Sequence, residues 1–287
     1  MRIGIGLPNP VPDTPGGRLV EWAVRAEERG FAGLVTIDRL VYPSHDSLIS
    51  LAAAAGATRR IGLMTNILLG PLYPAVPLAK ATASLDQLSG GRFTLGLAPG
   101  GRPDDYRAAG RDFHTRGADL DAQLDLMHRA WNGENIADTG HPATPPPTRG
   151  GAVPVMIGGT SDAAVRRAAR WGAGWTAGGA PAKMAAPVAE RVRGAWREAG
   201  REGEPRVAGL AYFSLGDDVE QESLAYLRHY YGFAGHRAEM IASGALRTDS
   251  AIKEAVGAFA DLGFTELYFD PTVASLNQVD RLADLIL

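Results

Sequence analysis

A pair of glycines between an apolar run and a helical pattern is the feature of this sequence that points most directly to chemistry. The segment PVMIGGTSDAAVRRAARW passes from four apolar residues through Gly158 and Gly159 to Thr160 and Ser161. Because glycine has no side chain, backbone amides there can approach a ligand closely, and a helix N-terminus carries roughly half a positive charge. The arrangement predicts a phosphate-binding site. The alternative is a tight turn followed by an ordinary Ser or Thr helix cap.

The elements around this pair predict a closed parallel barrel. Short apolar runs alternate with amphipathic helical patterns, which is typical of parallel strands joined by crossover helices. The predicted strands are residues 2–7, 33–37, 61–68, 93–98, 153–157, 174–176, 206–213 and 266–269. The predicted helices are residues 17–29, 46–58, 73–88, 115–131, 161–171, 182–199, 252–262 and 275–287. Eight strand-helix units in 287 residues predict an α/β fold, a (β/α)8 TIM barrel formed by one domain over residues 1–287.

Three segments depart from the regular repeat. Residues 100–116 and 132–151 flank the fourth helix, and the second contains PATPPPTRGG, which is too rich in proline for regular structure. Residues 216–248 are polar and aromatic, with the run LRHYYGFAGH, and we expect extra helix there near the mouth of the barrel. The sequence therefore predicts insertions after strands 4 and 7.

The residues that follow each strand are the candidates for function, because the catalytic face of a barrel lies at the carboxyl ends of its strands. From the first strand to the last they are Pro8, Asn9, Asp38, Arg39, Thr65, Asn66, Pro99, Gly100, Gly101, Gly158, Gly159, Thr160, Ser161, Tyr212, Ser214 and Asp270. A further aromatic set either lines a substrate entrance or packs in the core: Tyr106, Tyr230, Tyr231 and Phe233.

Composition excludes several classes of protein. The formal net charge is -3 and no basic run occurs, so we expect no nucleic-acid partner. The chain has no cysteine, and its six histidines show no ligand spacing such as HExxH, so we expect no metal site. MRIGIGLP is too short and too glycine-rich for a signal peptide, and no run of 18 uncharged apolar residues occurs. We therefore expect a cytoplasmic protein without membrane contact.

Several motifs in order resemble the luciferase-like oxidoreductases, which use a flavin or the deazaflavin F420 on a (β/α)8 barrel. The matching segments are MRIGIGLP, LVTIDRL, RIGLMTNILLGPLYPAVPLAKATASLDQLSGGRFTLGLAPGG, DFHTRGADLDAQLDLMHRAWNGE and PVMIGGTSDAAVRRAARWGAGW. The pattern is strong over residues 1–176 and weak beyond. Each motif alone is weak, and their common order makes the resemblance specific.

The resemblance implies a tricyclic cofactor, FMN or alternatively F420, across the barrel mouth, with its phosphate on the amides of the 158–159 glycine pair. It implies a cis peptide bond between Asn66 and Ile67 behind the ring. It also implies contacts from the loop after strand 4. The residues expected to bind the cofactor are Asn66, Ile67, Pro99, Gly100, Gly101, Gly158, Gly159, Thr160 and Ser161.

The chain departs from the family pattern at two positions. Many relatives have an acidic residue followed by His after strand 2, where this chain has Asp38 and Arg39. Arginine stays charged and cannot shuttle a proton, so we expect Arg39 to stabilise an anionic reduced flavin or an enolate-like substrate. The alternative is a surface ion pair between Arg39 and Asp38. Pro99 replaces a residue that usually offers a donor, which puts one phosphate contact in doubt.

The expected activity is oxidation or reduction of a small organic substrate, with Asp38 and Arg39 as catalytic residues. FMN would need a flavin reductase or NAD(P)H as its electron source, whereas F420 would exchange hydride directly. Two alternatives stay open: a flavin-binding barrel without turnover, and a phosphosugar or aldolase-type barrel, which lacks a suitably placed lysine. The small residues of ISLAAAAG would permit close helix approach in a homodimer, although they also suit packing on the barrel.

Overall fold

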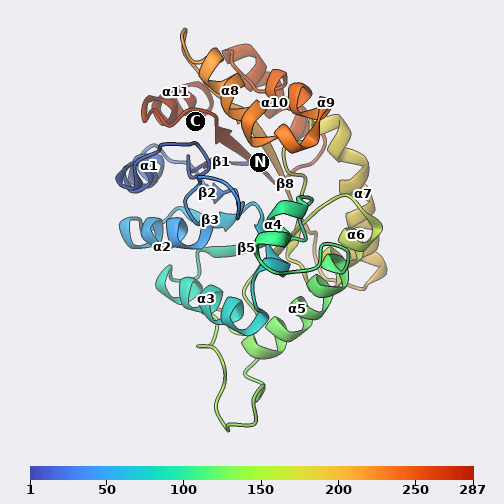
Figure 1. The fold of residues 1–287 in the computed structure, drawn as a ribbon. Helices are drawn as coiled ribbons and strands as arrows, with labels where there is room; N and C mark the ends of the chain where they lie inside the picture. Colours follow the sequence, from blue (N-terminus) through green and yellow to red (C-terminus); the bar gives the residue numbers. More distant parts are fainter.

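The computed structural model describes residues 1–287 and confirms the predicted closed barrel (Figure 1). All strand pairs are parallel, in the order β3-β2-β1-β9-β8-β7-β6-β5-β4, and an additional β3–β5 pairing closes the sheet. The strands are β1 (Arg2–Gly6), β2 (Gly33–Thr36), β3 (Gly62–Thr65), β4 (Leu68–Leu69), β5 (Phe93–Ala98), β6 (Val155–Gly158), β7 (Gly174–Thr176), β8 (Arg206–Phe213) and β9 (Glu266–Pro271).

The third predicted strand is divided into β3 and β4 because the chain bulges between them. Leu63 and Met64 of β3 pair with the beginning of β5, whereas β4 pairs with Leu97 and Ala98 at its end. The Thr65 hydroxyl exchanges hydrogen bonds with the backbone of Gly96 and so holds the bulge to β5. The peptide bond between Asn66 and Ile67, within this bulge, is cis, as predicted.

Helices surround the barrel on its outer side, as Figure 1 shows. The eight that alternate with the strands are α1 (Gly16–Glu28), α2 (Ser47–Ala57), α3 (Ala75–Leu88), α5 (Arg116–Trp131), α6 (Asp162–Trp171), α7 (Ala182–Glu198), α10 (Asp249–Asp261) and α11 (Asn277–Ile286). Side chains cap three of them: Asp46 accepts from the amide of Ile49, Ser161 from Ala164 and Thr248 from Ala251. The predicted cap of the helix after the glycine pair is therefore present at Ser161.

The irregular segments lie where the sequence predicts them. Residues 99–115 contain the short helix α4 (Pro103–Ala108), and residues 132–151 contain no helix or strand. The expected extra helix between β8 and α10 consists of α8 (Glu220–Tyr230), the 3-10 turn η2 (Gly232–Ala234) and α9 (His236–Ser243). A second 3-10 turn, η1 (Gly70–Leu72), follows β4. No helix combines the length and apolar character needed to cross a bilayer.

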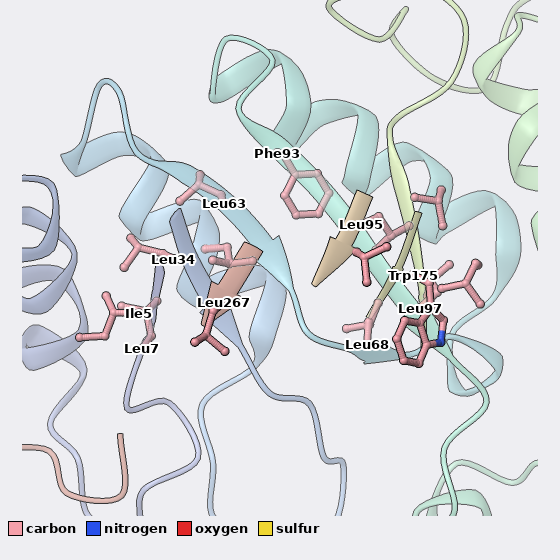
Figure 2. Packing of buried hydrophobic residues seen from close by; sticks show 14 of the residues in the cluster. Ile5, Leu7, Leu34, Leu63, Leu68, Phe93, Leu95, Leu97, Trp175 and Leu267 are labelled. Atoms are coloured by element: carbon pink, nitrogen blue, oxygen red, sulfur yellow. The ribbon is translucent and has the colours of Figure 1, made fainter. Parts of the chain in front are cut away.

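Two apolar clusters determine where the barrel and its insertion lie. The larger one holds 48 buried residues and joins all strands to the eight surrounding helices, and Figure 2 shows part of it, including Leu34, Leu95 and Trp175. A smaller cluster joins Leu210 and Tyr212 of β8 to residues of α8 and α9. The smaller cluster therefore packs the α8–α9 insertion against the carboxyl-terminal half of β8.

Candidate active site

A cavity of about 210 Å³ opens at the carboxyl ends of the strands, where the barrel fold places active sites. Its lining includes five residues that the sequence singles out as catalytic or cofactor-binding: Asp38, Asn66, Ile67, Gly100 and Gly101. Loops after β2, β3 and β5 contribute these residues, which lie far apart in the chain. Of the predicted strand-end residues in the first half of the barrel, Asp38, Asn66, Gly100 and Gly101 thus come together around one space, whereas Pro8, Asn9, Arg39, Thr65 and Pro99 do not line it.

The bulge between β3 and β4 forms one side of the cavity. The carboxamide oxygen of Asn66 accepts a hydrogen bond from the Thr176 hydroxyl at 2.8 Å, while its buried nitrogen has no partner within the protein. A Cβ atom added to Gly158 would lie 3.1 Å from a methyl group of Ile67, so the glycine gives Ile67 its space. The bulge therefore offers an apolar side chain and one free donor.

Asp38 is the only carboxylate among the residues that line this cavity. The residue is 7% exposed, and one carboxyl oxygen accepts a hydrogen bond from the amide of Leu69 at 2.9 Å. Burial raises the pKa of Asp38 to about 7, and the charges of Asp46 and Asp105 add to the effect, which hydrogen bonds from Leu69 and Tyr73 oppose. A carboxyl group with this pKa can either donate or accept a proton near neutral pH.

Arg39 does not lie in the cavity lining. Its guanidinium forms an ion pair with Asp104 at 3.2 Å, donates to the carbonyl of Tyr230 at 3.2 Å, and lies 4.9 Å from the centre of the Tyr42 ring. The alternative of a surface ion pair with Asp38 is wrong, because the partner is Asp104 and the Arg39 side chain is only 11% exposed. In the structure Arg39 joins the loop after β2 to α4 and α8.

Arg102 lines the cavity, and the sequence analysis missed it. Its guanidinium carbon lies 4.3 Å from the centre of the Phe233 ring and 4.5 Å from that of Tyr230, and the guanidinium donates to the Tyr230 carbonyl at 3.3 Å. No carboxylate forms an ion pair with it, although it is buried. Its position directly after the glycine pair 100–101, in a loop already predicted to be functional, was the signal available in the sequence.

An aromatic wall completes the cavity on the side of the α8–α9 insertion. It consists of Tyr212, Tyr230, Tyr231 and Phe233, of which Tyr212 and Tyr231 share a hydrogen bond between their hydroxyl groups. Tyr106, the other predicted aromatic residue, is 1% exposed and donates its hydroxyl to the carbonyl of Pro99. The sequence left Tyr106, Tyr230, Tyr231 and Phe233 open between entrance and core, and the structure assigns the last three to the cavity wall, together with the strand-end residue Tyr212.

The glycine pair after β6 is divided between two roles. Gly158 is the last residue of β6 and is buried against Ile67, whereas Gly159, Thr160 and Ser161 are exposed. The backbone amides of these three residues donate to no group of the protein. Gly159 has φ of +108°, a conformation that side chains disfavour. The free amides thus begin at Gly159, one residue later than the sequence predicts.

The charges around these amides are mixed. Arg191 of α7 donates to the carbonyl of Thr160 at 3.3 Å and also pairs with Asp162 in the first turn of α6. The positive end of α6, three unpaired amides and a nearby guanidinium together favour an anion, although Asp162 offsets part of the charge. Because Gly158 touches Ile67, which lines the cavity, these amides lie next to the cavity wall.

The loop after β5 contributes a glycine whose conformation is required. Gly100 has φ of +72°, and a Cβ atom there would lie 2.6 Å from Leu69, whereas a Cβ atom at Gly101 would meet nothing within 4 Å. Pro99 does not line the cavity. Gly100 therefore lets the backbone pass close to β4 at the cavity edge.

Asp270, another predicted strand-end residue, is fully buried at the end of β9 outside the cavity lining. Neither of its carboxyl oxygens has a hydrogen-bond partner, and burial raises the pKa of Asp270 well above its usual value. No group of three or more His, Asp or Glu side chains that could hold a metal ion occurs in the structure.

Comparisons with known proteins agree with this geometry. The chain is 30% identical over 128 residues to an F420-dependent glucose-6-phosphate dehydrogenase of Amycolatopsis mediterranei, which is 41% of this chain and 38% of that protein. Monooxygenase RslO1 of Streptomyces bottropensis has a similar structure, with TM-score 0.79 and 22% identity over 99% of this chain and 97% of the other.

A third similar protein is the oxygenating constituent of 3,6-diketocamphane monooxygenase of Pseudomonas putida, in complex with FMN. Its TM-score is 0.75 at 16% identity, covering 100% of this chain and 98% of the other. At these identities the two solved structures support the fold alone. The model of the luciferase-like monooxygenase family matches residues 1–267, so the chain belongs to the luciferase-like monooxygenases.

Proposed function

We propose that this chain is an oxidoreductase that binds FMN at the barrel mouth and acts on a small organic substrate. The observation that carries the proposal is the pairing of two features: a cavity with one protonatable carboxylate and an aromatic wall, and three free amides at the start of α6 beside it. Membership of the luciferase-like family supports redox chemistry at this end of the barrel.

The residues present suit a planar cofactor with an anionic tail. The amides of Gly159, Thr160 and Ser161 would hold the phosphate at the N-terminus of α6. Ile67 and the aromatic wall offer apolar surface to a ring, and the free nitrogen of Asn66 offers a donor to a polar ring edge. When bound, such a cofactor supplies or accepts a pair of electrons.

Two side chains of the cavity would handle charge. Asp38 holds or releases a proton at its carboxyl oxygen near neutral pH, because burial raises its pKa to about 7. Arg102 presents a buried positive charge without a carboxylate partner, which suits an anionic substrate group or developing negative charge. The aromatic residues around it exclude water and contact the organic part of the substrate.

F420 is the second candidate cofactor. The observation that favours it is the sequence similarity to an F420-dependent glucose-6-phosphate dehydrogenase, which is 30% identical over 128 residues. With F420 the enzyme would exchange hydride directly with its substrate. With FMN it would depend on a flavin reductase or on NAD(P)H as its source of electrons. We also propose that the protein forms a homodimer.

An absorbance titration of the purified protein with FMN and, separately, with F420 tests the proposal. We expect saturable binding of at least one cofactor, with a perturbed spectrum because the ring leaves water for an apolar cavity. Substrate-dependent oxidation of the bound reduced cofactor, measured over a panel of small organic compounds, would show that the cavity is catalytic. Binding without any such turnover would instead favour a cofactor-binding barrel without activity.

A further inference from the structure

A group of five arginines lies at the opposite end of the barrel, where the strands begin. A cavity of about 350 Å³ there is lined by Arg2, Arg60, Arg92, Arg149 and Arg206. Arg2 and Arg206 are the first residues of β1 and β8, Arg92 immediately precedes β5, and Arg60 lies two residues before β3. Five guanidinium groups therefore gather around one space in a chain whose formal net charge is -3.

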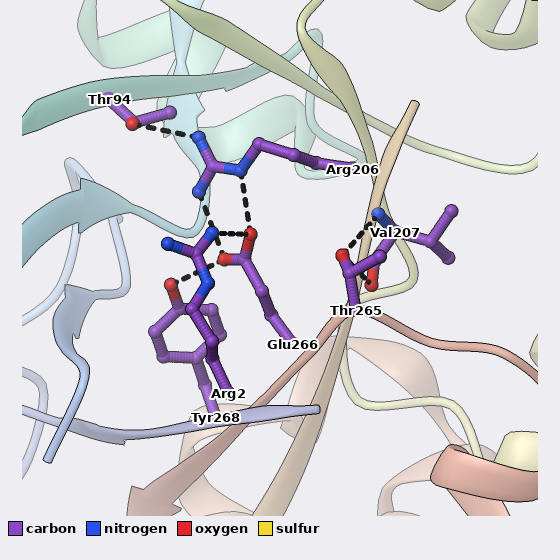
Figure 3. A network of polar contacts seen from close by, with 7 residues as sticks. All are labelled: Arg2, Thr94, Arg206, Val207, Thr265, Glu266 and Tyr268. Carbon is purple, nitrogen blue, oxygen red and sulfur yellow. Dashed lines mark hydrogen bonds and ion pairs between the residues drawn. The ribbon is translucent and has the colours of Figure 1, made fainter. Parts of the chain in front are cut away.

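One carboxylate lies among these charges, and its bonding capacity is fully used. Glu266, which is 1% exposed, accepts from Arg2 at 2.5 Å and from Arg206 at 2.6 and 2.9 Å, and also from the hydroxyl of Tyr268 at 2.7 Å (Figure 3). The remaining guanidinium nitrogen of Arg206 donates to Thr94. Glu266 compensates one of the two positive charges that it contacts.

The other three arginines have no carboxylate partner in the cavity. Arg92 donates only to Thr58 and to backbone carbonyls, whereas the guanidinium groups of Arg60 and Arg149 donate to no protein group. A further carboxylate near these arginines is that of Glu27, which accepts from the backbone amides of residues 59–61. Even with Glu27 included, the cavity keeps an excess of positive charge.

Guanidinium groups that share a cavity repel one another unless an anion lies between them. The fork of N–H donors on arginine also matches the oxygens of phosphate and carboxylate groups in geometry. From the cavity volume, the five arginines and the free guanidinium groups of Arg60 and Arg149, we infer that this end of the barrel binds a compact polyanion, a phosphorylated compound or a polycarboxylate. This site is separate from the cavity at the barrel mouth and does not depend on the proposed function.

Isothermal titration of the full chain, dialysed free of phosphate, with pyrophosphate and separately with citrate tests the inference and distinguishes the two anion types. We expect one of the probes to bind saturably with one molecule per chain. Arg60→Gln and Arg149→Gln should each weaken that binding by roughly tenfold, the value of one charge-assisted hydrogen bond. Arg59→Gln is the matched control, since Arg59 is adjacent and exposed but does not line the cavity.

Melting temperatures of the wild type and the variants, measured without anion, show whether a loss of binding reflects a loss of folding. Arg60 and Arg149 are exposed and donate to no protein group, so their replacement should leave the melting temperature unchanged or raise it by relieving repulsion. Three results would overturn the inference: no saturable binding of either probe to the wild type, equal affinity in all variants, or loss of binding in Gly159→Asp instead, which would place the probe at the barrel mouth. A lower melting temperature of both glutamine variants would also overturn it, because the arginines would then serve folding.

Discussion

Asp38→Asn replaces the only carboxylate of the mouth cavity by a neutral side chain of the same size. The folded-state pKa of Asp38 is about 7 against 3.8 for the free group, so the unfolded chain releases this proton first as the pH rises. As the pH rises from the pKa of Asp38 in the unfolded chain to its pKa in the folded chain, Asp38 therefore lowers the free energy of unfolding. At 1.36 kcal/mol per pKa unit, the penalty grows by about 2–3 kcal/mol between roughly pH 5 and 8.

Urea denaturation of wild type and Asp38→Asn at these two pH values measures the effect. The free energy of unfolding of the variant should rise relative to that of the wild type by about 2–3 kcal/mol from the acidic to the alkaline condition, because asparagine does not titrate. Other ionisable groups cancel, since both proteins contain them. A difference between the two proteins that stays constant with pH would refute the reasoning, because Asp38 would then ionise in its ordinary range.

Three further sets of substitutions test other parts of the account. Arg39→Ala should lower the free energy of unfolding by about 1–3 kcal/mol because its buried hydrogen bonds are lost, and Asp104→Asn should lower it less. An unchanged denaturation midpoint of Arg39→Ala would contradict this structural role. Gly100→Ala should lower the free energy of unfolding by about 1–3 kcal/mol, and Gly101→Ala should lower it much less, because only Gly100 has a positive φ and a close neighbour. Equal melting temperatures of the two variants would contradict this. Burial alone would raise the pKa of Glu266, but the hydrogen bonds and the charge of Arg206 lower it to about 2. Glu266→Gln should therefore lower the free energy of unfolding by ~3 kcal/mol at neutral pH. This cost should vanish as the pH falls from 4.5 through about 2 in denaturation curves, and a cost that persists in acid would contradict the shift.

The barrel could be predicted from the sequence because its signal is repeated. Each strand is a short apolar run and each helix an amphipathic pattern, so an error of one or two residues at a boundary leaves the topology intact. The split of the third strand into β3 and β4 could not be predicted from periodicity, because it arises from the bulge that Thr65 holds against Gly96. The extra helices after β8 were expected only as a region, since α8 and α9 are held by packing on Tyr212 and Leu210.

The site was predicted less completely than the fold. Strand-end positions such as Asp38 and Asn66 were found because the fold dictates which end of each strand faces the cavity. The partner of Arg39 was not predicted, because Asp104 is 65 residues away in the chain and α4 brings it close. Arg102 and the division of roles between Gly158 and Gly159 depend on side-chain packing that no local pattern contains.

The measurement that tests the central claim most directly is the affinity of Gly159→Asp for FMN and F420, compared with wild type and with Gly133→Asp. Gly133 is an exposed glycine with φ of +79° and open space around it, so the control matches the added charge and also places Asp at a positive φ. A carboxylate at position 159 would repel the negatively charged phosphate. We therefore predict that Gly159→Asp weakens cofactor binding by more than about tenfold, while Gly133→Asp has no effect. Equal affinities in all three proteins would contradict the assignment of the free amides at the start of α6 to the cofactor phosphate.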